Sequence, residues 1–265
     1  MDTAIVREKA EYHRIAAEEM ARSLGVPAWS PREKLALACR MLAAEGHGSG
    51  LAGQLTTRGD APGTYYAMRF GLGLDEITAD NVVLIDDDLN VLQGTGMVNP
   101  SNRFHLWIYR ARPSVGCIVH THPPHASALS MIGVPLKPAH MDTSMFYEDC
   151  AWLPEWPGVP IGDEEGELIS NALGDNRSIL LAHHGLLTAC GDIEEAVVLA
   201  LFLERAARLQ LLASAAGTIQ DLPPAVAREA HDYRLKKKPI GATFAYFARR
   251  ALRDDPDILA ASSSP

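Results

Sequence analysis

Two histidines placed two positions apart give this sequence its strongest chemical signal. His120 and His122 end the segment 115–122 (VGCIVHTH), whose apolar residues predict a buried strand that stops before two prolines. Residues two apart in a strand point to the same face, so the two imidazoles converge. Two imidazoles on one face can chelate a metal ion, and open α/β sheets place ligands at the ends of their strands. A surface pair, or one catalytic histidine beside a bystander, is the alternative.

A second histidine pair lies further along the chain. His183 and His184 follow a short apolar strand (ILLA, residues 179–182) and directly precede Gly185, which permits a tight turn. Adjacent residues in a strand face opposite ways. One of the two histidines can therefore join the first pair while the other packs elsewhere, and a histidine satisfied within the core is the simpler alternative.

Helices and strands alternate along most of the chain. Residues 30–33 (SPRE) form a capping box with proline at the first helical position, which predicts a helix up to about Gly46. Other helices are expected at 10–24, 99–112, 125–131, 164–173, 192–216, 226–233 and 243–252. Strands are expected at 54–58, 65–70, 81–86, 115–122, 178–182 and 186–189. The proline-rich stretch 133–162 predicts a long loop with short strands.

Composition restricts the partners and the compartment. The chain has 265 residues and a formal net charge of −9, which argues against nucleic acid or an anionic membrane as partner. No apolar run approaches the roughly 20 residues of a membrane span, and no secretory signal is visible at the N-terminus. The four cysteines show no CxxC spacing, which favours reduced thiols in the cytoplasm. Because no linker interrupts the chain, we expect one α/β domain over residues 1–265.

Several segments together resemble the class II aldolase/adducin family, over about residues 30–217. They are residues 109–122 (YRARPSVGCIVHTH), 183–191 (HHGLLTACG), 203–210 (LERAARLQ), 50–58 (GLAGQLTTR) and 70–73 (FGLG). The resemblance implies a three-layer α/β/α sandwich with a largely antiparallel central sheet, followed here by a helical extension at 218–260. It also implies a homotetramer whose active sites lie between subunits.

The resemblance further implies that three histidines hold one divalent metal ion. By position these are His120, His122 and His184, and His183 is left as a neighbour. Neutral imidazoles suit zinc, manganese, iron or cobalt, so the ligand set does not select the metal.

The sequence departs from the sugar-phosphate aldolases of this family at one segment. Those enzymes carry a catalytic glutamate in a Pro-Ser-Ser-Glu segment, whereas residues 99–105 here read NPSNRFH and contain no carboxylate. Six nearby residues are candidates for the chemistry that remains. His105, Tyr147 and Glu148 are candidate catalytic groups, with His105 also a candidate fourth ligand, and Asn102, Arg103 and His125 are candidate substrate-binding groups.

The expected function is that of a metal-dependent carbon–carbon lyase. Its substrate would be a small hydroxy, keto or hydroxy-aryl carboxylic acid, cleaved by decarboxylation or retro-aldol reaction through a metal-stabilised enolate. Decarboxylation needs no base for a substrate alcohol, so the missing glutamate favours it. The alternatives are a non-haem iron oxygenase of the same fold, acting on a prenylated aromatic keto or hydroxy acid, and, less favoured, a non-catalytic adducin-like interaction domain.

Overall fold

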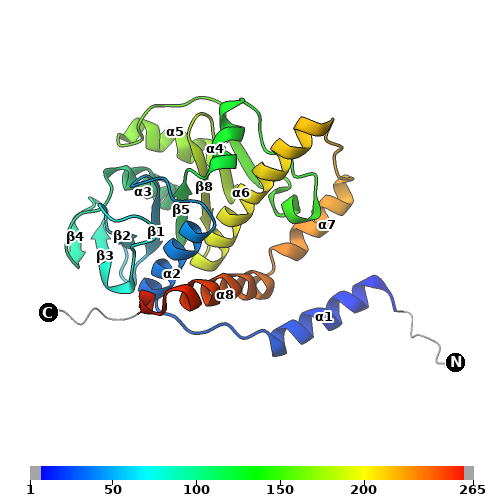
Figure 1. The fold of residues 1–265 in the computed structure, drawn as a ribbon, viewed down its shortest axis with the longest axis horizontal. Helices are drawn as coiled ribbons and strands as arrows, with labels where there is room; N and C mark the ends of the chain where they lie inside the picture. Colours follow the sequence, from blue (N-terminus) through cyan, green and yellow to red (C-terminus); the bar gives the residue numbers. More distant parts are fainter. Residues whose placement is uncertain (1–6, 260–265) are drawn as a thin grey trace.

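The computed structural model describes residues 7–259 and is built around one eight-stranded sheet (Figure 1). The strand order is β4-β3-β2-β1-β5-β8-β7-β6, and every neighbouring pair is antiparallel except β6 and β7. The strands are β1 (Gln54–Arg58), β2 (Thr64–Met68), β3 (Val82–Asp86), β4 (Val91–Gln93), β5 (Cys117–Thr121), β6 (Cys150–Leu153), β7 (Ser178–Leu181) and β8 (Gly185–Cys190). The expected largely antiparallel sheet is therefore confirmed.

Helices cover both faces of the sheet, and side chains of its central strand pack alternately into one helix layer and then the other. Ile118 of β5 packs with residues of α3 (Arg103–Ala111) and α5 (Asp163–Leu173). Its neighbours Cys117 and Val119 pack with residues of α2 (Pro31–Ala44) and α6 (Ile193–Ala216). Both helix layers bury apolar side chains against strands that alternate in the same way. The result is the expected α/β/α sandwich.

Four further helices of the described chain lie around this sandwich. The short helix α4 (Pro124–Met131) packs against α6, and α8 (Lys237–Asp254) packs across α2 and α6. Helix α7 (Pro224–Arg234) precedes α8, whereas α1 (Lys9–Ser23) buries none of its residues and lies beyond α8, away from the sheet (Figure 1). Four 3-10 turns complete the structure: η1 (Ala79–Asn81), η2 (Pro100–Asn102), η3 (Met141–Phe146) and η4 (Pro256–Leu259). Between residues 7 and 259, no helix has the length and apolarity that crossing a membrane requires.

Most predicted elements are present, with shifted ends. The capping box is formed: Ser30 accepts from the amide of Glu33, and the Glu33 carboxylate accepts from the amide of Ser30. The strand predicted at 115–122 ends at Thr121, so His122 follows it. The loop 133–162 contains η3 and β6, the last helix starts six residues early at Lys237, and β4 was not predicted. The sequence pattern missed β4 because its residues are half-buried or exposed. Residue 260 of the predicted extension, the extreme N-terminus and the C-terminal tail lie outside the described residues.

Candidate metal centre

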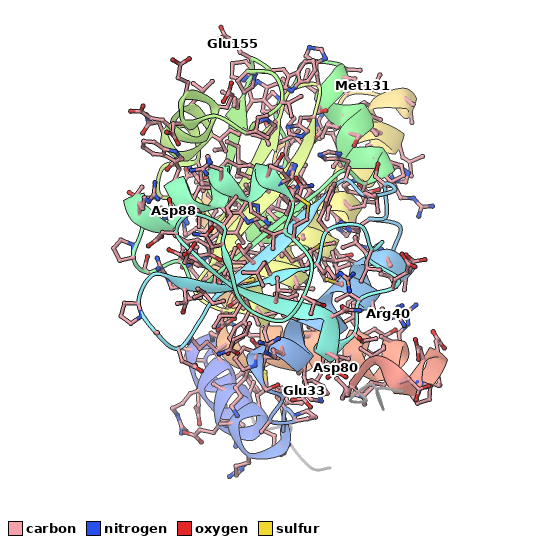
Figure 2. All side chains as sticks on the ribbon, turned by 90° about the vertical axis from the view of Figure 1, so that its left-hand side faces the viewer. Glu33, Arg40, Asp80, Asp88, Met131 and Glu155 are labelled. Atoms are coloured by element: carbon pink, nitrogen blue, oxygen red, sulfur yellow. The ribbon has the colours of Figure 1, made fainter. Side chains whose placement is uncertain are left out.

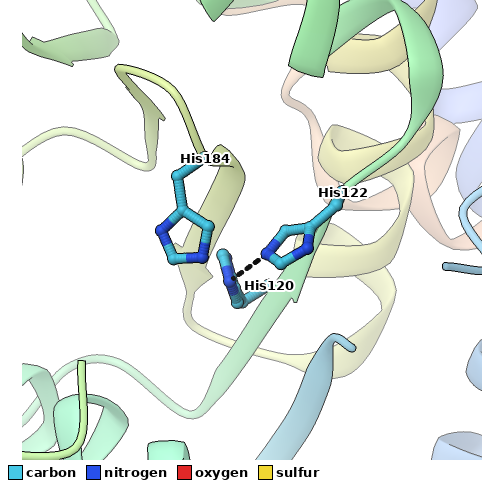
Figure 3. Close-up of side chains that lie close together, drawn as sticks. All are labelled: His120, His122 and His184. Atoms are coloured by element: carbon cyan, nitrogen blue, oxygen red, sulfur yellow. Dashed lines mark hydrogen bonds between the residues drawn. The ribbon is translucent and has the colours of Figure 1, made fainter. Parts of the chain in front are cut away.

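Three imidazole rings meet at one end of the central strands (Figure 3). His120 is the fourth residue of β5, His122 follows the end of that strand, and His184 lies in the turn between β7 and β8. One ring nitrogen of each residue lies within 4.8 Å of the others. The ring centroids are 4.6–4.8 Å apart, and the Nε2 atoms of His120 and His122 are separated by 2.9 Å. The residues predicted from the two motifs therefore converge.

His120 is held by the middle of the sheet. Its backbone pairs with Gln54 of β1 and Leu187 of β8, and its side chain is 1% exposed. Its Nδ1 lies 2.8 Å from the carbonyl oxygen of Leu186. Because a carbonyl oxygen only accepts, Nδ1 carries the proton and Nε2 keeps its lone pair. A hydrogen bond of this kind is how metal-binding histidines are usually oriented in proteins.

The turn between β7 and β8 selects which of the paired histidines faces the site. His183 has a φ of 56°, the left-handed region that histidine enters more readily than most residues, and its side chain is exposed. The next residue, His184, turns toward His120 and His122. Gly185 follows, where an added Cβ would lie 2.5 Å from the carbonyl oxygen of Thr121 and 2.8 Å from the His122 ring. Only glycine allows the turn to approach the end of β5 this closely.

Burial keeps the three rings neutral. Desolvation lowers the pKa of His120 well below its usual 6.5, with smaller contributions from the neighbouring histidines. Desolvation also lowers the pKa of His122, and together with His122 it lowers the pKa of His184 to about 4. Neutral imidazole is the form that binds metal ions. The site is therefore in its metal-binding protonation state at neutral pH.

The donor set fits a divalent transition metal. Three imidazole nitrogens converge, and no carboxylate of the described chain belongs to the group. Three protein ligands with a free fourth position are typical of catalytic rather than structural zinc sites, and imidazole suits zinc, iron, cobalt and manganese. The residues present can thus hold the ion that the sequence predicts.

The three histidines line a cavity of about 300 Å³. A polar wall comes from the first residue of β1 and from the turn before α3, and comprises Gln54, Asn99 and Ser101. An apolar wall comes from the loop between β6 and α5, and comprises Trp156, Gly158, Val159 and Pro160. Figure 2 shows Glu155, which directly precedes this loop's tryptophan, at the same end of the molecule as Met131 at the end of α4.

Two predicted residues lie in the layer next to this cavity without lining it. Asn102 is fully buried, and neither its amide nitrogen nor its amide oxygen has a protein partner. His105 is fully buried, its Nδ1 lies 2.8 Å from the Thr56 hydroxyl, and its Nε2 has no partner. Desolvation lowers the pKa of His105 to about 3. The ring is outside the three-histidine group, so a role as fourth ligand gains no support, and its catalytic role remains a prediction.

The other four predicted residues lie elsewhere. Arg103 is half-buried at the start of α3 and does not line the cavity. Glu148 pairs with Arg228 of α7, whose guanidinium lies 5.1 Å above the Tyr147 ring. His125 contacts Glu204 and lines a different cavity, of about 420 Å³. In the described chain these side chains thus do not line the cavity of the three histidines, and their roles in substrate binding and catalysis stay predictions.

Sequence reasoning missed the residues that shape the cavity. Gln54 is a polar residue at the start of an otherwise buried strand, which is a detectable signal because buried polar groups need partners. Its Oε1 has none in the described chain. Trp156 is one of several aromatic residues near the histidine motifs that would suit an aromatic substrate, but its proline-rich loop has no periodicity to single it out. Glu204 interrupts a long apolar helix face, and that pattern could have been noticed.

Comparison with known proteins agrees with this geometry. The family model of the Class II Aldolase and Adducin N-terminal domain matches residues 33–211. A 3,4-dihydroxyphthalate decarboxylase from Arthrobacter keyseri is 32% identical over 216 residues, covering 74% of this chain and 86% of that protein. A 4-hydroxy-3-prenylphenylpyruvate oxygenase/4-hydroxy-3-prenylbenzoate synthase from Streptomyces roseochromogenus subsp. oscitans is 31% identical, covering 68% of this chain and 66% of that protein.

A solved structure shows the same architecture. The L-fuculose 1-phosphate aldolase from Glaciozyma antarctica PI12 superposes with a TM-score of 0.79 at 28% identity, covering 89% of this chain and 96% of that one. The family match spans the histidine-bearing strand, the histidine turn and most of α6. On the matched family model, the shared fold and the placement of the histidines, this chain belongs to the class II aldolase and adducin family.

Proposed function

We propose that this enzyme is a metal-dependent lyase that decarboxylates a small hydroxy or keto acid, with hydroxy-aryl acids as the favoured class. The observation that carries the proposal is the group of three neutral histidines at the wall of a cavity. A divalent ion bound there supplies Lewis acidity, which stabilises the negative charge that develops on a substrate oxygen when a carbon–carbon bond breaks.

The polar wall supports decarboxylation over sugar-phosphate aldol cleavage. No carboxylate of the described chain lines the cavity, so no base for a substrate alcohol is evident there. Gln54, Asn99 and Ser101 can instead bind substrate oxygens by hydrogen bonds. Asn102 and Arg103 follow Ser101 in the same segment but do not line the cavity, so their binding of a substrate carboxylate stays a prediction.

The apolar wall supports an aromatic substrate. Of the aromatic residues near the histidine motifs, Phe104 and Phe146 are buried in the two cores, and the Trp107 indole donates to Asp163. Trp156 differs from them: it lines the cavity and is 54% exposed. An exposed indole beside a metal site can stack on a flat ring and exclude water from the reacting bond. The relative named as a dihydroxyphthalate decarboxylase also favours an aromatic substrate.

Metal analysis combined with a gas assay tests the proposal. The protein is purified without added metal, its metal content is measured, and dihydroxybenzoate-type and keto acids are supplied under nitrogen. The expected result is about one divalent ion per chain and release of CO₂ without O₂. Protein that binds no divalent ion, or that remains inactive with every acid under nitrogen, contradicts the proposal.

A second candidate is a non-haem iron oxygenase acting on an aromatic keto or hydroxy acid. The observation that favours it is the all-histidine donor set, together with the relative named as a prenylphenylpyruvate oxygenase. Iron in the purified protein and O₂ consumption stoichiometric with the acid would select this candidate over the lyase.

We also propose that the protein is a cytoplasmic homotetramer with active sites between subunits. All four cysteines are free thiols, which suits a reducing compartment. A subunit contact at the cavity would also bring polar groups to a site whose own walls provide few. Light scattering that gives the mass of a monomer at micromolar concentration would contradict this assembly.

A further inference from the structure

Glu204 is a buried carboxylate whose hydrogen bonds all reach the helix that follows the metal-binding strand. It lies on α6, is 8% exposed, and lines the same cavity of about 420 Å³ as His125. Its Oε1 accepts from the amide of His125 at 3.0 Å and from His125 Nδ1 at 2.5 Å, and its Oε2 accepts from the amide of Ala126 at 2.7 Å. A buried charge is tolerated only when it is well hydrogen-bonded, and three donors meet this condition.

The carboxylate replaces a missing helix cap. Helix α4 begins at Pro124, its N-cap residue is Pro123, and no side chain of the cap position accepts a hydrogen bond. Prolines have no N–H, so His125 and Ala126 supply the first free donors of the helix. Both donate to Glu204. A negative charge at this end also interacts favourably with the helix dipole. One side chain from α6 therefore anchors the first turn of α4.

The first anchored residue, His125, is separated from His122 by two residues. The residues between His122 and His125 are Pro123 and Pro124, whose rings restrict the backbone. His120 is held by two neighbouring strands and by Leu186. His122 follows the last residue of β5, and its ring lies against the His120 and His184 rings and close to Gly185. No backbone group of the described chain accepts a hydrogen bond from this ring, so its position depends also on the segment that follows it.

We propose that Glu204 is a positioning residue for the metal site. It fixes the first turn of α4 and, through the two prolines, holds His122 where it meets His120 and His184. The inference rests on the proposed metal function. Glu204 does not line the histidine cavity and is assigned no contact with substrate or metal.

The test measures metal affinity on the full chain separately from folding. Metal-free protein is titrated with Co²⁺ in competition with a chromophoric chelator, and urea unfolding of the same metal-free protein is followed. The variant is Glu204→Gln, which keeps the size but lacks the second acceptor oxygen. The matched control is Glu194→Gln, which removes a carboxylate of the same helix that pairs with Lys34 and not with α4.

We expect Glu204→Gln to weaken Co²⁺ binding by about 10- to 100-fold, the usual range for groups that orient a metal ligand. Glu194→Gln should stay within about 2-fold of wild type, because its ion pair is remote from the ligands. A Glu204→Gln protein that loses stability but binds Co²⁺ like wild type overturns the inference, since the residue is then only structural.

A second variant covers the case in which Glu204→Gln does not fold. Pro124→Gly leaves Glu204 and its donors intact but loosens the connection to His122, and Pro124 is exposed. Weaker Co²⁺ binding by this folded variant supports the inference, and unchanged binding overturns it. If wild-type protein itself does not bind Co²⁺, the proposed metal site fails and this inference fails with it. If wild-type protein binds Co²⁺ and the Glu204 and Pro124 variants bind it equally well, the proposed metal site stands and the positioning role of Glu204 fails.

Discussion

The chain uses histidine in two opposite ways, at the candidate metal centre and at the buried ion cluster around His231 of α7. In the cluster, His231 has a carboxylate on each ring nitrogen: Asp149 at 3.1 Å from Nε2 and Asp232 at 2.8 Å from Nδ1. Asp149 also pairs with Arg177, whose backbone amide donates to it at 2.7 Å. At the metal centre, the three histidines face one another, and no carboxylate belongs to their group in the described chain.

The difference shows what separates a structural histidine from a candidate ligand. Both ring nitrogens of His231 face a carboxylate oxygen, and the contact with Asp149 joins α7 to the segment before β6, so the ring contributes to packing. At the cavity, Nδ1 of His120 faces the carbonyl oxygen of Leu186 and its Nε2 faces Nε2 of His122, so among the described residues these rings have one another and a carbonyl oxygen as partners instead of carboxylates. The partners of the ring, rather than its burial, therefore distinguish the two roles.

The largest expected effect is a loss of folding stability at acid pH, caused by buried histidines that have no carboxylate partner. Desolvation lowers the pKa of His47 and of His105 to about 3, against 6.5 for an exposed histidine. Between these values the unfolded chain binds protons that the folded chain does not, so stability falls as pH falls from about 6.5 toward 3. Each such histidine contributes about 1.4 kcal/mol per pH unit. Urea unfolding of metal-free protein from pH 7.5 to 4.5 measures the slope, and a flat profile below pH 6.5 contradicts the prediction.

Next in size is the loss of a ligand. His122→Ala should weaken Co²⁺ binding by more than about 100-fold, since even groups that only orient a ligand change affinity by 10- to 100-fold. Chelator competition gives the affinity. Circular dichroism should show a folded protein, because His122 is only half-buried. A variant that keeps wild-type affinity would falsify the ligand assignment.

The matching change in the α7 cluster should lower folding stability and leave Co²⁺ affinity unchanged. His231→Ala removes a hydrogen-bonded contact with the buried Asp149 and should lower the free energy of unfolding by about 2 kcal/mol. Co²⁺ affinity should remain at the wild-type value. The comparison between the two regions breaks down if this variant loses metal binding while its urea midpoint is unchanged.

The smallest effect concerns the apolar wall. Trp156→Ala should weaken the binding of an aromatic acid by about 10-fold, because aromatic stacking contributes roughly 0.5–1.5 kcal/mol beyond area burial. Unfolding should be unaffected, since the side chain is 54% exposed. Trp156→Phe is the control that keeps a ring. Isothermal titration with dihydroxybenzoate and with an aliphatic keto acid checks the prediction, and equal losses for both acids count against it.

The sequence predicts the fold and the convergence of the three histidines well where the signal is local. Strand periodicity places His120 and His122 on one face, and the family resemblance assigns His184 rather than His183. The structure confirms that the three rings converge. The choice within the second pair depends on the left-handed backbone of His183, which the adjacent glycine suggests but periodicity alone does not determine.

The rest depends on contacts between distant segments. His125 is close to the ligands in sequence, yet its ring turns to Glu204, 79 residues further along the chain. Tyr147 and Glu148 likewise contact Arg228 of α7. The apolar wall at Trp156 belongs to a loop whose position is set by its packing beside the sheet. No periodicity in the chain encodes such contacts, so side-chain roles outside the two histidine motifs could not be predicted from spacing.

The close approach of Gly185 to the end of β5 has a consequence for how this family can diverge. An added Cβ would meet backbone and a ligand ring at under 3 Å, so neither neighbour can move without displacing the site. In a saturation library, position 185 should therefore accept no substitution. Position 183, which is exposed, should tolerate glycine and asparagine. New substrate preferences would then have to arise from changes in the walls of the cavity, while His184 and Gly185 stay unchanged.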